Sequence, residues 1–107
     1  MLPETLLSLA EAMAGADPVR AKAAKREMAH QVHAACAPKK PGRERAALIK
    51  DLTTLLETRR PRLVRAHAAR LIGYAGSKGE DKALAKYASD PEIGEDIKMA
   101  RERIQRA

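Results

Sequence analysis

Apolar residues recur every three or four positions along most of this chain, which is the spacing of a helix face that packs on a core. One such stripe reads Ala21, Ala24, Met28, Val32 and Ala35, with charged residues between its members. Similar stripes occur in five other segments, and proline and glycine separate the segments. The pattern predicts six helices in three antiparallel hairpins, over approximately residues 2–36, 43–76 and 80–106 of a single domain, 1–107. It predicts no strand.

The predicted helices can bury one common core. We expect its central side chains to be Leu48, Leu52, Leu55, Val64, Ala68, Leu71, Leu84 and Ile97. Composition agrees with an all-α fold, because the chain has 22 Ala and 11 Leu but only 3 Val, and no Phe or Trp. A core this rich in alanine predicts helices that approach one another closely.

Each predicted hairpin places a proline near the start of its second helix. The three turns read Asp17-Pro18, Arg60-Pro61 and Asp90-Pro91. An aspartate followed by proline suits the N-cap and first position of a helix. Intervals of 43 and then 30 residues between the prolines are typical of stacked helical repeats.

The segment 60–73 resembles the second helix of a HEAT repeat, especially the short bacterial form related to phycobilisome-lyase repeats. The family pattern is roughly Asp-Pro, then Val-Arg, then Ala-Ala-x-x-Leu-Gly, and the residues that follow it here are Val64, Arg65, Ala68, Ala69, Leu71 and Gly73. The first repeat keeps Val19 and Arg20, and the third has Gly94 in place of the arginine. The resemblance implies a short α-solenoid that serves as a scaffold and binds proteins or nucleic acid through its second helices. A compact helical bundle is the alternative.

Positive charge is concentrated in the middle of the chain. The net charge is +7, whereas the stretch from Arg20 to Arg70 alone carries a surplus of +10. Such a surplus attracts polyanions. We expect a basic face formed by Arg20, Lys22, Arg26, Arg62, Arg65 and Arg70, with Arg20 and Arg65 in matching positions of adjacent repeats. Arg65 and Arg70 should project away from the apolar stripe of their helix.

Two functions follow from these features. The first is a non-catalytic scaffold that binds a protein partner, acidic or otherwise. The alternative is sequence-independent binding of nucleic acid through the basic face. Leucines at positions 2, 6, 7 and 9 predict a broad apolar surface on the first helix, suited to an end cap that covers the open side of the terminal repeat. That surface suggests a weak homodimer or a docking site.

Candidate catalytic and metal-binding residues are few. His30, His33 and Cys36 have spacing that could suit zinc, but the cysteine lies about 240° around the helix from the first histidine. We expect surface histidines there and a core-edge histidine at His67, with no metal, no cofactor and no enzymatic activity. A single cysteine and short apolar runs predict a cytoplasmic protein with no membrane segment.

Overall fold

A computed structural model of the chain describes residues 5–36, 42–76 and 78–106. These residues form six α-helices and one 3-10 turn, and none of them is in a strand. The elements are α1 (Leu6–Met13), α2 (Pro18–Ala35), α3 (Gly42–Thr54), α4 (Arg62–Ala75), η1 (Lys78–Glu80), α5 (Asp81–Ala85) and α6 (Gly94–Arg106). The all-α prediction is confirmed.

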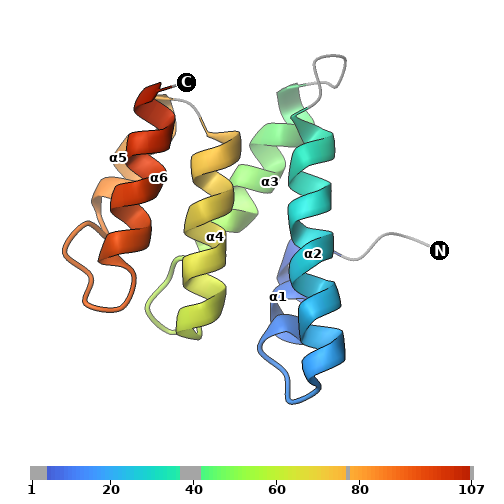
Figure 1. Cartoon of the computed structure of the whole chain (residues 1–107). Coiled ribbons are helices and arrows are strands. Elements are labelled where there is room, and N and C mark those ends of the chain that lie inside the picture. The colour runs from blue at the N-terminus through green and yellow to red at the C-terminus, as the bar shows by residue number, and fades with distance from the viewer. Residues whose placement is uncertain (1–4, 37–41, 77, 107) are drawn as a thin grey trace.

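The helices form two layers (Figure 1). The second helices of the three pairs, α2, α4 and α6, lie side by side and run in the same direction, with α4 in the middle. Behind them lie α1, α3 and α5, each antiparallel to the helix that follows it. The molecule measures 37 × 35 × 18 Å. Its shortest dimension fits two layers of helices, each about 10 Å thick. We call α2, α4 and α6 the front layer.

Local signals set several of the helix starts. Asp17 caps α2 as predicted, because its Oδ1 accepts hydrogen bonds from the backbone N–H of Val19 at 3.0 Å and of Arg20 at 3.3 Å. The last helix begins later than predicted, at Gly94, although the Oδ1 of Asp90 accepts from the backbone N–H of Glu92 and Ile93 in the way that Asp17 does at the start of α2. Of the segment 37–42, whose two prolines and glycine predict a loop, Gly42 instead begins α3. Residues 37–41 and Leu2 lie outside the described residues.

The core contains most of the side chains expected there. Those confirmed as buried are Leu52, Leu55, Val64, Ala68, Leu71, Leu84 and Ile97, whereas Leu48 is only half-buried. Leu6 and Leu9 are buried in the same core. Their burial agrees with the apolar surface predicted on the first helix for an end cap, and Leu7 is half-buried beside them, whereas a homodimer through this helix stays a prediction.

The front layer is not uniformly packed. Gly73 of α4 lies so close to α6 that a Cβ on it would be 2.8 Å from the Cα of Ala100. Two small residues facing each other let the two helix backbones approach, as the alanine-rich composition predicted. The contact between α4 and α6 is the most extensive between any two helices of the described chain, and α4 contacts α2 far less.

Candidate functional site

The exposed side of the front layer carries large apolar side chains. Among the described residues, the large apolar side chains that are exposed are Val19 (77%), Leu63 (66%), Met99 (63%) and Tyr74 (39%), and all belong to α2, α4 or α6. On each helix an exposed arginine follows the apolar residue after seven positions, which places both on one side of the helix. We define the front face as Val19, Lys22, Lys25, Arg26, Leu63, Arg70, Tyr74, Met99, Arg103 and Arg106.

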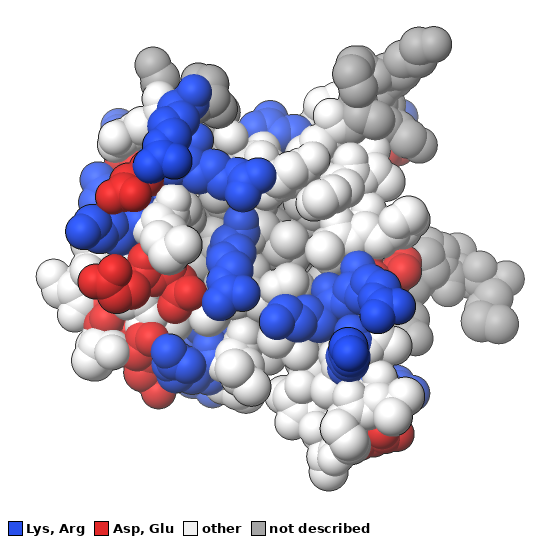
Figure 2. Space-filling model, viewed as in Figure 1, with Lys and Arg blue, Asp and Glu red and all other residues white. Residues whose placement is uncertain are grey.

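Charge on the front face is unevenly distributed. Figure 2 shows Lys and Arg side chains spread across it from α2 to α6, with Asp and Glu gathered on the α6 side. The acidic residues of α6 are Glu95, Asp96 and Glu102. The front face is therefore mainly cationic over α2, whose one acidic residue is Glu27, and mixed in charge over α6.

Tyr74 links the three front helices. Its ring stacks on His33 of α2, with the ring centroids 4.0 Å apart and the planes 12° from parallel. The guanidinium carbon of Arg103, on α6, lies 5.1 Å from the centroid of the same ring. Sequence reasoning did not identify this cluster. The signal was the position of Tyr74 four residues after Arg70 and eleven after Leu63, on the exposed side of α4.

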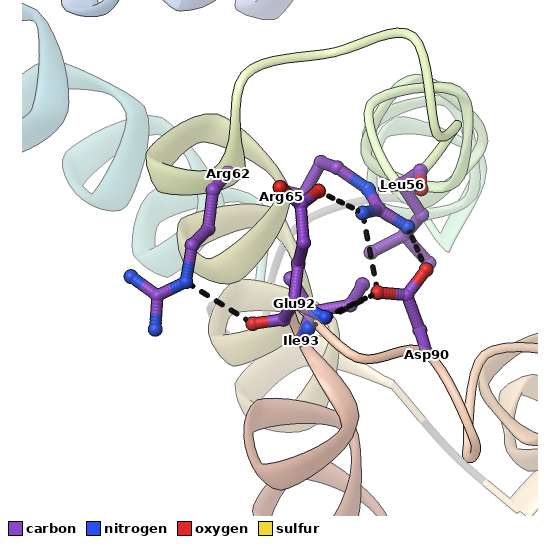
Figure 3. Close-up of polar contacts among 6 residues, drawn as sticks. All are labelled: Leu56, Arg62, Arg65, Asp90, Glu92 and Ile93. Carbon is purple, nitrogen blue, oxygen red and sulfur yellow. Dashed lines mark hydrogen bonds and ion pairs between the residues drawn. The ribbon is translucent and has the colours of Figure 1, made fainter.

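Arg65 is not part of the front face. Only 1% of the residue is exposed, and its Nε donates to the carbonyl oxygen of Leu56 at 2.9 Å. Its guanidinium also forms ion pairs with Asp90 and, at 2.8 Å, with Glu92 (Figure 3). The hydrogen bond from Arg65 lowers the pKa of the Asp90 carboxyl below its ordinary value.

The predicted exposure of Arg65 is therefore wrong, for a reason that lies in tertiary structure. Helix α4 is the middle helix of the front layer and also packs on α3, so most of its circumference is covered. Arg65 lies on a covered side, where the turn before α6 brings two carboxylates to it. The predicted match with Arg20 also fails, because Arg20 is exposed beside the α1–α2 turn, around a hollow that Glu11 also lines.

The other predicted cations divide into two groups. On α4, Arg62 donates to the carbonyl oxygen of Glu92 at 3.2 Å, and Arg70 lies 3.7 Å from Asp96. On α2, by contrast, Lys22 and Arg26 are exposed and form no ion pair with any described residue. The largest group of front-face cations that have no ion pair with a described carboxylate is thus on α2, and Arg103 of α6 is a further one.

A buried histidine lies between α2 and α4. The Nε2 of His67 is 3.1 Å from the carbonyl oxygen of Lys25, and 6% of the residue is exposed. Burial, with smaller contributions from the charges of Lys25 and Arg70, lowers the pKa of His67 below its ordinary value. The ring is therefore neutral at pH 7, and Nε2–H donates to the carbonyl. The core-edge position predicted for His67 is confirmed.

The spacing considered for zinc does not assemble a site. His30 is exposed, His33 stacks on Tyr74, and Cys36 is a half-buried residue at the C-cap of α2. Within residues 5–36, 42–76 and 78–106, no three His, Cys, Asp or Glu side chains are arranged to hold a metal ion. None of the described helices has the length and apolar character needed to cross a membrane.

The chain matches no protein-family model, no curated protein and no solved structure. The features of the chain that bear on its function are therefore those of the front face.

Proposed function

We propose that the chain is a non-catalytic, HEAT-like interaction module that binds a protein partner through the front face. The observation that carries this proposal is the distribution of exposed apolar side chains. Val19, Leu63, Tyr74 and Met99 all lie on the second helices, which are the helices that form the binding surface of helical-repeat scaffolds. Each has a cationic side chain on the same side of its helix. We further propose that the protein itself is cytoplasmic, in keeping with its single cysteine.

The chemistry of the face favours a protein over a nucleic acid. Aromatic residues, Met and Arg are enriched at protein interfaces, and the front face carries all three kinds. Nucleic acid affinity depends mainly on cations that are free to neutralise phosphates. Here Arg65 is buried against carboxylates, Arg70 is close to Asp96, and Glu95 and Glu102 add negative charge at the α6 side.

Sequence-independent binding of nucleic acid is the second candidate. The observation in its favour is the set of cations on α2 that have no acidic partner among the described residues, Lys22, Lys25 and Arg26. If it holds, duplex DNA binds at low salt, and log affinity falls linearly with log salt at about −0.9 per phosphate contacted. A protein complex that uses apolar contacts shows a much smaller slope.

Site-directed crosslinking tests the proposal. A photoreactive residue replaces Leu63 or Met99 on the front face or, as a matched control, the exposed Lys50 on α3 in the rear layer. In native extract treated with nuclease, we expect the same protein to be captured from both front positions and not from position 50. Nuclease-sensitive capture, or equal capture from both layers, contradicts the proposal.

Purified partner then gives the energetic test. Each of Leu63→Asp and Met99→Asp should weaken binding by about 1.5–3 kcal/mol, which is the contribution of one apolar side chain that becomes buried. The melting temperature should stay unchanged, because both side chains are more than 60% exposed in the free protein. Unchanged affinity in both variants places the interface elsewhere.

A further inference from the structure

The two contacts that α4 makes within the front layer differ in charge. Towards α6, every arginine of α4 has an oxygen partner: Arg65 pairs with Asp90 and Glu92, and Arg70 lies near Asp96. Towards α2, the charges that reach the buried His67 are both positive and come from Lys25 on one helix and Arg70 on the other. Lys22 and Arg26 are further exposed cations on the same helix as Lys25.

We define the α2–α4 seam as Lys22, Lys25 and Arg26 of α2, Leu63 and Arg70 of α4, and Val19 at one end. We propose that this seam binds an acidic segment of the protein partner, with carboxylates between the two helices and an apolar anchor on Val19 and Leu63. This inference rests on the proposed function and specifies the chemistry of the partner. Complementary charge is the argument for the occupant, because the three α2 cations of the seam, Lys22, Lys25 and Arg26, form no ion pair with a described carboxylate.

The layout of the seam also specifies the order of residues in the segment. Val19 and Leu63 are each the second residue of their helix, and α2 and α4 run in the same direction, so both lie at the same end of the seam. Arg26 and Arg70 come seven residues later, which is about 10 Å along each helix axis. A matching segment has apolar residues at one end and carboxylates about 10 Å further on, two turns later if it is helical.

The surroundings restrict where a carboxylate can bind. On the α6 side, Asp96 already lies 3.7 Å from Arg70, and the charges of α6 are mixed, because the exposed Glu95 and Glu102 are accompanied by Arg103 and Arg106. On the α2 side, Lys22, Lys25 and Arg26 attract it. A carboxylate over the seam also favours a proton on His67 beneath it, so binding of the segment should raise the pKa of that imidazole.

A synthetic probe tests this inference directly. The probe is a fluorescent 14-residue helical peptide that has two leucines at one end and three glutamates two turns further on. Fluorescence anisotropy measures its binding to the full chain and to the double variant Lys25→Glu, Arg26→Glu. The control variant is Lys50→Glu, Lys82→Glu, which changes the net charge equally at exposed positions of the rear layer. Melting followed by circular dichroism checks that both variants fold.

We expect the seam variant to bind the probe at least tenfold more weakly and the control variant to stay within twofold of the unchanged protein. A peptide with glutamine in place of glutamate should also lose at least tenfold, and a peptide with the leucines and glutamates in reverse order should bind less well. In NMR titrations, the probe should raise the pKa of His67. Equal binding of the glutamate and glutamine peptides overturns the inference, as does an equal loss in the seam and control variants.

The crosslinking experiment separates this inference from the proposed function. If Leu63 and Met99 capture a protein whose affinity is unaffected by Lys25→Glu and Arg26→Glu, the face is a docking surface but its occupant is not acidic at the seam. If front and rear positions capture alike, the proposed function itself fails. Displacement of the probe by a 20-base-pair DNA duplex, with a steep dependence on salt, overturns both in favour of nucleic acid.

Discussion

Reversing the charge of Arg65 should unfold or nearly unfold this protein. In Arg65→Glu, a third carboxylate replaces the guanidinium beside Asp90 and Glu92, in a position where 1% of the residue is exposed. The hydrogen bond that Arg65 Nε donates to the carbonyl oxygen of Leu56 is lost as well. Had Arg65 been on an exposed basic face, the same substitution would change stability very little.

The expected loss follows from the burial of the pair. Removing one partner of a buried ion pair costs about 3–5 kcal/mol, because the other charge stays buried without compensation. A chain of 107 residues is stable by roughly 5–15 kcal/mol in total. Arg65→Glu therefore removes a large part of the free energy of unfolding. Arg65→Lys keeps the charge but loses the forked geometry, so its loss should be smaller, at about 1–3 kcal/mol.

Urea unfolding followed by circular dichroism at 222 nm measures both losses. The loss of stability is read from the shift in the midpoint when the dependence of unfolding free energy on urea concentration is unchanged. Arg106→Glu is the matched control, because that arginine is 81% exposed and its contact with Glu102 is 3.9 Å long. Its effect should stay below about 1 kcal/mol. An Arg65→Glu protein that unfolds at nearly the urea concentration of the unchanged chain would refute the buried network.

Three further changes probe the rest of the fold. Leu52→Ala should lose about 2–5 kcal/mol in urea unfolding, because Leu52 is fully buried in the core. Gly73→Ala should lower the melting temperature despite the helix propensity of alanine, since its Cβ would meet the Cα of Ala100 at 2.8 Å; a higher melting temperature would contradict the close approach. Stability should decrease as pH falls below about 6.5, because the unfolded chain binds a proton at His67 that the folded chain resists. The melting temperature of His67→Gln should vary less between pH 7.5 and 5 than that of the unchanged protein. An equal variation in both proteins would show that other groups cause the pH dependence.

Much of the fold was predictable from the sequence, because it depends on local patterns. The stripe through Ala24, Met28 and Val32 marks the buried side of α2, and Asp17 before Pro18 marks its start. These signals need only the periodicity of a helix and the chemistry of its first turn. The scarcity of β-branched and aromatic residues argued against a sheet in the same way.

Charge placement was predicted less well, because it depends on which helix lies between two others. A helical wheel of α4 assigns Arg65 to the polar side of the helix. In the structure that side is covered by Leu56, which follows α3, and by the turn before α6 that carries Asp90 and Glu92. The partner Asp90 is 25 residues away in the sequence, on a turn whose approach no local pattern indicates. The same holds for the stack of His33 on Tyr74, which joins α2 to α4.

The unequal contacts of α4 have a consequence for cooperativity. Close backbone packing at Gly73 and the ion pairs of Arg65 join α4 to α6, whereas α1 and α2 pack mainly on each other. The first hairpin can therefore detach as a subglobal unit while the remaining helices stay folded. Amide hydrogens of α1 and α2 then exchange with solvent through an opening of lower free energy than those of α4 and α6. A ligand that bridges α2 and α4 would slow exchange throughout that hairpin, well beyond the residues it touches.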